Sequence, residues 1–409
     1  MSAPKKIKTA ELRPGMVFDQ PVFIDSENVL VQANQEISGR DIERLVKWGI
    51  TEVETSGSLM AKKARDEDDP SDAPPPAATG FMDPGLISRP DDALKKIIQR
   101  YDQLRRNKRN FKRLLSESAD VLHTNIRNLY ENRQFENRAV IDIANRLTNE
   151  ICEKPLMLIM FQATRFTPEW IVHHALHAGA YACLLGQEMR YSRPRLQELM
   201  FATILMDTGM LSVPGHILEK TEQLNEKEWA NVKAHPLLGY KLLTSQGKVK
   251  SSLANVSLQH QETFHGKGYP QGLKGGQIEE ISRIAHIVDS YTAMIERRPY
   301  RKANLPYEAM KTILSVDMHS YDPKLLRLFL GLVSIYPIGS IIKLSNDMTG
   351  MVVASKADKP LRPVIRLMRD AEGLPFNDLY FLDLTQKTEL YIVSAISPAS
   401  AGIQLEAEI

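Results

Sequence analysis

The chain has 409 residues, enough for two or three folding units, and its 43% hydrophobic and 25% charged residues are typical of globular proteins. A formal net charge of +2 is too small to indicate binding to a nucleic-acid polymer or an anionic membrane. Cys152 and Cys183 provide neither a disulfide framework nor a cysteine-based zinc motif, and no apolar stretch has transmembrane length. We therefore expect a cytoplasmic protein that binds no nucleic-acid polymer and no membrane.

Four segments follow one another along the chain. Residues 1–55 alternate apolar and polar positions and then become helical, which predicts a small N-terminal α+β module. Residues 56–92 are rich in charge, Pro, Ala and Gly and predict a flexible linker. Residues 93–335 have apolar residues at helical spacing, whereas residues 336–409 have β-branched runs between turn residues. The predicted fold class is therefore mainly α, with a helical domain followed by a short C-terminal β-rich tail.

The helical run from Leu94 to Leu129 has apolar residues along one face. Such a face fits a homodimer interface, and it fits burial within its own chain equally well. The sequence leaves these two alternatives open.

Several polar residues continue the apolar faces of predicted helices. In "RLQELMFATILMDTG" the apolar spacing runs onto Asp207, and His174, His260 and Asp289 continue other apolar faces in the same way. His235 precedes Pro236, a residue suited to the first turn of a helix. One such histidine alone is better explained as a hydrogen-bonded core residue. Five imidazole and carboxylate donors on separate helices favour one shared Zn, Fe or Mn centre.

The stretch "HQETFHGKGYPQGLKGGQI" at residues 260–278 resembles a known signature, HHExxDGxGYPxGLxGxxI. This signature belongs to the HD-GYP subgroup of the HD-domain metal-dependent phosphohydrolases, whose members hydrolyse cyclic di-GMP. Further similar segments are "LMDTGMLSVPGHIL", "AHPLLGYKLL" and "IVDSYTAMIERRPYRKA", so the resemblance covers residues 170–305. It implies an HD-type helical fold, a role in cyclic di-GMP signalling, and a cyclic dinucleotide as the bound partner.

The resemblance also implies a ligand set for two or three divalent ions, namely His174, Asp207, His235, His260 and Asp289. Asp207 would be the catalytic residue that bridges two ions. His174 and Asp289 would hold one ion, and His235 and His260 the other. In the family, a hydroxide held between the metals attacks phosphorus.

Substrate contacts are implied for Tyr269, Arg298 and Arg301, which match family positions that contact the base and phosphates. Arginine suits this role because its guanidinium donates paired hydrogen bonds to phosphate oxygens. On spacing alone, the two arginines are better explained as a solvated basic turn.

Five residues depart from the family pattern. Met206 and Gln261 stand where the family has metal-binding histidines, and both are poorer ligands for Fe, Mn or Zn than imidazole. Met210 replaces a lysine, Trp170 replaces a glutamate found in three-metal members, and His265 replaces an acidic residue. We expect these departures to lie at the reaction centre and to reduce metal binding, leaving the metal weakly held or absent.

Three functions follow from this pattern. The favoured hypothesis is a catalytically impaired or inactive HD-GYP protein that binds a cyclic dinucleotide or a protein signalling partner. The alternative is an active cyclic di-GMP phosphodiesterase with three protein ligands for each ion, helped by His265, His286 or His173. A third hypothesis is a helical interaction domain whose histidines are core residues and which binds no nucleotide.

Two other motifs are weaker. In "HHALH", His173 and His177 are one helical turn apart, as zinc ligands often are. The glutamate that follows the first histidine in metalloproteases is missing here, so the motif alone does not indicate a zinc enzyme. The basic stretch from Arg105 to Arg113 is interpreted as the solvated face of a packed helix.

Overall fold

The computed structural model describes residues 5–24, 29–37, 39–47, 50–60, 90–164, 166–167, 169–297, 303–315, 318–356 and 358–409. These residues form two compact units, one before residue 77 and one after it. Most of the predicted linker, together with Arg298 and Arg301, lies outside the described residues. Within the described ranges, no helix combines the length and the apolar character needed to cross a membrane.

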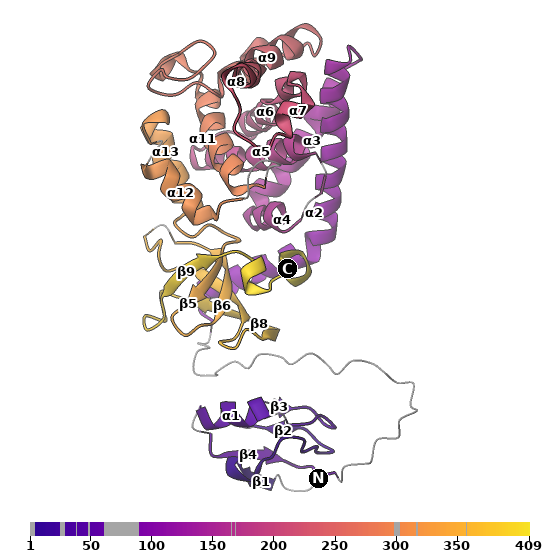
Figure 1. Cartoon of the computed structure of the whole chain (residues 1–409), viewed down its shortest axis with the longest axis vertical. Coiled ribbons are helices and arrows are strands. Elements are labelled where there is room, and N and C mark those ends of the chain that lie inside the picture. Colours follow the sequence, from indigo (N-terminus) through magenta and orange to yellow (C-terminus); the bar gives the residue numbers. More distant parts are fainter. Residues whose placement is uncertain are drawn as a thin grey trace. The chain divides into compact units, whose positions relative to one another are not determined.

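The first unit is a small antiparallel sheet with one helix (Figure 1). Its strands pair in the order β1-β4-β2-β3, and its elements are β1 (Lys5–Lys8), η1 (Thr9–Glu11), β2 (Val22–Phe23), β3 (Val29–Val31), α1 (Gly39–Lys47) and β4 (Glu52–Thr55). Alternate strand residues such as Val22 and Val53 pack with Leu45 of α1 in a core of their own. After β4, the Met60 N–H donates to the Val17 carbonyl at 2.9 Å, so the first residues of the predicted linker border this sheet.

The second unit begins with a helical body built around α5. Its helices are α2 (Asp92–Tyr130), α3 (Asn137–Glu153), α4 (Leu158–Ala163), α5 (Trp170–Glu188), α6 (Arg193–Ile204), α7 (Gly215–Leu218), α8 (Glu226–Lys233), α9 (His235–Ser245), α10 (Ser251–Gln259), α11 (Glu280–Ile295), α12 (Pro306–Ser315) and α13 (Pro323–Val333). Short 3-10 turns connect some of them: η3 (Pro155–Met157), η4 (Thr208–Ser212), η5 (Gly275–Gln277) and η6 (Met318–Ser320). α5 is apolar almost all round and packs against α3, α6, α11 and α13, which makes it the central helix.

The long helix α2 runs along one side of this body (Figure 1). Asp91 caps its start, because the Asp91 carboxylate accepts the Leu94 N–H at 2.7 Å. Its apolar residues, including Tyr101, Leu115 and Leu122, are buried in the core of the same unit. The apolar face of α2 is therefore buried within its own chain.

A five-stranded antiparallel sheet follows the helices, in the order β8-β7-β6-β5-β9. Its elements are β5 (Ile341–Leu344), β6 (Thr349–Ala354), β7 (Val364–Arg369), β8 (Pro375–Asp383) and β9 (Ile392–Ile396), followed by η7 (Ala399–Ala401) and α14 (Leu405–Glu408). Side chains alternate between two faces: Ile341 and Met351 join the core of the helical body, whereas Ile342 and Val352 join a second core. These elements confirm the predicted fold class, a mainly helical chain with a small N-terminal α+β module and a C-terminal β-rich region.

Candidate metal centre

Five donors of the predicted ligand set meet inside the helical body. His174 lies on α5, Asp207 lies between α6 and η4, His235 begins α9, His260 follows α10, and Asp289 lies on α11. All five side chains are buried, and His174 and His260 are completely inaccessible to solvent. His174 and Asp289 contact each other although 115 residues separate them in the sequence. The fold therefore brings together donors that the sequence places on separate helices.

Close backbone packing positions three of these donors. A Cβ atom on Gly209 of η4 would lie 2.0 Å from the His235 carbonyl oxygen, so only glycine allows η4 and α9 to approach this closely. The Ser257 hydroxyl of α10 donates to the Met206 carbonyl at 2.7 Å. These contacts hold the Asp207 turn against the helices that carry His235 and His260.

The donors form two groups that share Asp207. In the first group, Oδ1 of Asp207 lies 3.5 Å from Nε2 of His235 and 3.4 Å from Nε2 of His260. In the second group, Oδ2 of Asp207 lies 3.6 Å from Nε2 of His174, which is itself 2.8 Å from Oδ1 of Asp289. Asp207 thus directs one carboxylate oxygen toward each group.

In His235 and His260, the ring nitrogen Nδ1 is hydrogen-bonded to a backbone carbonyl. Nδ1 of His235 donates to the Val232 carbonyl at 2.7 Å, and Nδ1 of His260 donates to the Ser257 carbonyl at 2.8 Å. In these tautomers, both Nε2 atoms carry lone pairs, and they face each other at 3.0 Å beside Oδ1 of Asp207. Three electron-pair donors converge there, which fits a bound cation, and such outer hydrogen bonds are typical of metal-binding histidines.

Charge in the pocket favours a cation as well. Burial alone would raise the pKa of Asp207, but His260, His235 and His174 hold the pKa of this carboxyl well below its usual value. Burial lowers the pKa of His235. For His260 burial acts in the same direction, but Asp207 outweighs it and raises the pKa of that imidazole. The ionised carboxylate at the centre therefore attracts positive charge from the groups around it.

The loop that follows His260, here called the Tyr269 loop, places Tyr269 beside the five donors. The Tyr269 hydroxyl donates to Oε1 of Gln261 at 3.1 Å, and Nε2 of Gln261 donates to Oδ2 of Asp289 at 2.8 Å. The Lys233 ammonium group at the end of α8 lies 5.7 Å from the centre of the Tyr269 ring. A cation, a phenol and an amide thus extend from the surface toward Asp289.

A buried glutamate holds this loop in place. Oε1 of Glu262 accepts the N–H groups of Gln271 and Gly272 at 2.7 and 3.1 Å, and Oε2 accepts that of Leu273 at 3.0 Å. Gly268 packs so closely that a Cβ atom there would lie 2.4 Å from Cα of Glu262. The glutamate of the recognised signature therefore has a structural reason that the sequence pattern alone did not reveal.

The five departures from the family pattern lie in different surroundings. Met206 is fully buried in the apolar core, and Trp170 packs with Met210 in a separate apolar cluster beside α7. Gln261 contacts Asp289 as described above, whereas His265 is exposed and its ring hydrogen-bonds to the His319 carbonyl. The structure thus places Gln261 against a candidate ligand and His265 at the surface, with its ring against the His319 carbonyl.

A third group of potential ligands was not predicted. His173 and His177 of α5 lie beside Glu296, which directly follows α11. Burial would raise the pKa of Glu296, but His174, His173 and His177 together hold it well below its usual value. The one-turn spacing of the two histidines was visible in the sequence. The partner Glu296 was not, because 119 residues separate it from His177.

Two segments of the chain match known domain families. Residues 159–325 match the model of the HD domain, and residues 341–403 match that of the KOW domain associated with the HD domain. The HD segment contains all five donors and the Tyr269 loop.

Curated relatives and a solved structure are also similar to this chain. A cyclic di-GMP phosphodiesterase of Pseudomonas aeruginosa, PA4108, is 26% identical over 64% of this chain and 63% of its own length. A cyclic di-GMP phosphodiesterase of Thermotoga maritima is 32% identical over 39% of this chain and 44% of its own. The chain thus spans less than two thirds of these relatives. An HDG"Y"P protein of Bdellovibrio bacteriovorus aligns with a TM-score of 0.44 and 15% identity, covering 80% of this chain and 98% of that one.

The helical body built around α5 is an HD domain. It contains the two groups of donors that share Asp207, here called the Asp207 centre. The Gly-Tyr-Pro segment at residues 268–270 and the curated relatives indicate which subgroup of HD domains this is. The chain belongs to the HD-GYP family.

Proposed function

We propose that this chain is an HD-GYP protein of cyclic di-GMP signalling that binds a cyclic dinucleotide at the Asp207 centre and hydrolyses it weakly or not at all. The observation that carries the proposal is the position of Gln261. Its amide nitrogen donates to Oδ2 of Asp289 at 2.8 Å, where the family pattern has an imidazole. An amide N–H cannot bind a metal, and it occupies an oxygen of a candidate ligand.

The two groups around Asp207 are the proposed places for two divalent ions. His235 and His260 would hold one ion, His174 and Asp289 the other, and Asp207 would contribute an oxygen to each. When bound, such ions lower the pKa of a coordinated water and offset charge on a phosphoryl group. The chain itself contributes hydrogen-bonded imidazoles and a buried carboxylate.

Reduced hydrolysis follows from the ligands that are missing. Met206 is buried in the apolar core, and a thioether is a poor ligand for Fe, Mn or Zn. Each group then has three protein donors. Met210 packs in an apolar cluster and offers no cation to a phosphate. The centre therefore keeps the donors that position metal and ligand but lacks several that the family pattern places there.

Nucleotide binding is proposed to use the Tyr269 loop. Tyr269 offers a ring face for a base, and Lys233 lies beside that ring as a cation for a phosphate. Arg298 and Arg301, which lie outside the described residues, remain predicted phosphate contacts. A protein signalling partner would be an additional ligand and is not needed for this proposal.

A second candidate function, an active cyclic di-GMP phosphodiesterase, is favoured by the two sets of three donors. Catalytic metal sites often have three protein ligands and one open position. Two curated relatives also carry this activity in their names.

The test compares binding with turnover in the full chain. Calorimetry with cyclic di-GMP measures binding, and product formation with added Mn²⁺ measures hydrolysis. We expect the wild type to bind, and the double variant Met206→His, Gln261→His to hydrolyse at least about 10-fold faster, since ligand-sphere changes alter activity by about 10- to 100-fold. Gln223→His, the same exchange at an exposed position outside the Tyr269 loop, is the matched control and should leave turnover unchanged.

Three results would count against the proposal. Fast wild-type turnover that disappears in Asp207→Ala would identify an active phosphodiesterase. Equal turnover in the wild type and the double variant would show that the missing histidines are not the cause of weak hydrolysis. A wild type that binds no cyclic dinucleotide would favour a helical interaction domain instead.

A further inference from the structure

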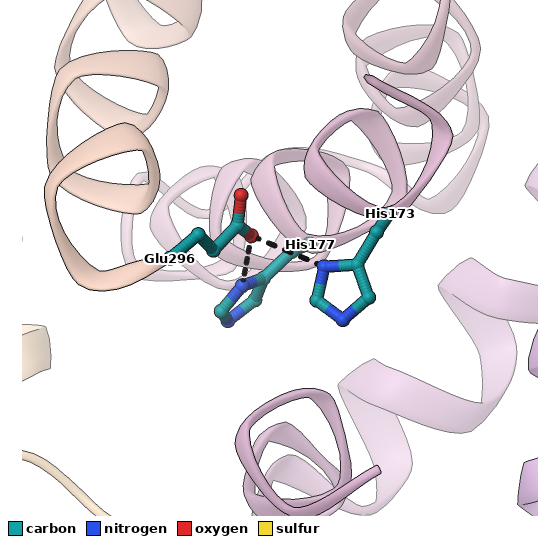
Figure 2. Close-up of side chains that lie close together, drawn as sticks. All are labelled: His173, His177 and Glu296. Atoms are coloured by element: carbon teal, nitrogen blue, oxygen red, sulfur yellow. Dashed lines mark hydrogen bonds and ion pairs between the residues drawn. The ribbon is translucent and has the colours of Figure 1, made fainter. Parts of the chain in front are cut away.

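We propose that His173, His177 and Glu296 form a second binding site for a divalent transition-metal ion, distinct from the Asp207 centre (Figure 2). The proposal does not depend on nucleotide binding or hydrolysis. It rests on the geometry of three donors, on the way their rings are held, and on a cavity beside them.

The three donors come from two packed helices. His173 and His177 lie one turn apart on α5, so both rings project from one face of the helix. Figure 2 shows a single carboxylate oxygen of Glu296 facing both rings. This atom, Oε1, lies 2.6 Å from Nδ1 of His177 and 3.5 Å from Nδ1 of His173. All three ligand atoms lie within 4.8 Å of one another, close enough to share one ion.

Aromatic packing fixes the two rings. The His177 ring stacks on Phe161 with centroids 4.9 Å apart and planes 3° apart, and the His173 ring stacks on Phe166 at 4.7 Å. The side chain of His177 is 1% exposed and that of Glu296 10% exposed. Fixed rings reduce the entropy that a ligand site loses when it binds an ion. Burial of a carboxylate also favours a nearby positive charge.

The site borders a cavity of about 430 Å³ between the helices and the sheet. His173, His177 and Glu296 line it together with apolar residues such as Trp170, Ile341 and Ile396. Three protein donors leave open coordination positions on an ion, and the cavity has room for water molecules to fill them. The site therefore resembles an open metal site rather than a closed structural one.

The donor set selects the class of ion. Two imidazoles and one carboxylate suit Zn²⁺ and its neighbours among the transition metals. Mg²⁺ and Ca²⁺ prefer oxygen ligands and are expected to bind poorly here.

Glu296 also connects this site with the Asp207 centre. Its second oxygen, Oε2, accepts a hydrogen bond from Nδ1 of His174 at 3.0 Å. An ion held by Oε1 would fix the Glu296 carboxylate and with it the orientation of the His174 ring. Occupancy of the second site should therefore strengthen metal binding by His174, because outer partners of a metal-binding histidine alter metal affinity about 10- to 100-fold.

The test measures bound zinc in Asp207→Asn, a variant that lacks the ligand shared by both groups of the Asp207 centre. Full-length Asp207→Asn, loaded with Zn²⁺ and dialysed, should hold one zinc per chain. Adding His173→Ala should remove it, whereas adding His216→Ala, an exposed histidine outside every group described above, should not. Loading with Mg²⁺ in place of Zn²⁺ should leave no bound ion.

The visible absorption spectrum of bound Co²⁺ identifies the ligands independently of the zinc content. Co²⁺ added to Asp207→Asn should give visible absorption bands that disappear with His173→Ala and with Glu296→Gln. If Asp207→Asn does not fold, the same comparison in the wild-type background should show a loss of one zinc per chain with His173→Ala. Equal zinc with and without His173 in either background, or a folded Asp207→Asn that binds no zinc, would overturn the proposal.

Discussion

Single residues decide how the Tyr269 loop is held beside the candidate metal centre. Glu262 is 1% exposed, and its carboxylate accepts three backbone N–H groups from residues 271–273. A carboxylate suits this role because it accepts hydrogen bonds at both oxygens. The loop then places Tyr269 against Gln261, which contacts Asp289. The position of the phenol thus depends in part on a carboxylate that is bonded to the backbone of residues 271–273, further along the same loop.

Glu262→Gln tests this dependence. An amide replaces one acceptor oxygen with an N–H₂ group, which would face backbone N–H donors and leave a buried group unsatisfied. We expect the free energy of unfolding to fall by about 1–3 kcal/mol, and the affinity for cyclic di-GMP to fall with it. Urea unfolding and calorimetry measure the two effects. Glu222→Gln, at an exposed position, is the control, and equal stability of the two variants would refute the role of Glu262.

Pairs of elements fix the distances between donors. η4 and α9 meet through Gly209 and Gly239: the Cβ atom that Gly209 lacks would lie 2.0 Å from the His235 carbonyl and 2.6 Å from the Gly239 nitrogen. Because Asp207 directly precedes η4 and His235 begins α9, this contact sets the separation of two donors. Any side chain at Gly209 must push the two elements apart.

Gly209→Ala should therefore damage both stability and metal binding. Overpacking of a close contact costs about 1–3 kcal/mol, and displacement of His235 should weaken the ion held with Asp207. Thermal unfolding and bound metal per chain are the measurements. Gly215→Ala adds the same methyl group where, beyond its neighbours in the chain, no atom of the described residues lies within 4 Å, and it should change neither quantity. Wild-type metal content in Gly209→Ala would show that the contact does not set the site.

The sequence predicts which side of each helix faces the core, but it does not predict which helices lie together. Helical spacing marks Asp207, His174 and His260 as polar residues on apolar faces, because a 3.6-residue period reveals which side of a helix is buried. It does not say which helices meet, since that depends on contacts between residues far apart in the chain. Glu296 was missed for this reason. His265 was expected at the reaction centre, but the backbone of residue 265 pairs with Lys274 and its ring contacts the His319 carbonyl.

The second unit as a whole is held by one core that helices and sheet share. Ile341 and Met351 of the sheet are buried with the apolar residues of α2 and α5. Arg366 of β7, 7% exposed, donates to the Tyr101 hydroxyl of α2 at 2.9 Å. The alternating strand pattern predicted the sheet, but the contact with α2 depends on pairs 265 residues apart and could not be read from the sequence.

The candidate metal centre also depends on the folding of the whole helical body, because its donors come from separate elements between residues 174 and 289. Asp207 is the one residue that both groups of the centre share. Substitution of Asp207 should therefore empty both places at once, whereas loss of any other donor affects one group directly.

The most direct measurement is the metal content of the wild type and of Asp207→Asn, loaded with the same divalent ion and dialysed together. We expect Asp207→Asn to hold two fewer ions per chain while it remains folded by circular dichroism. Equal metal content in the two proteins would contradict a metal centre built around Asp207.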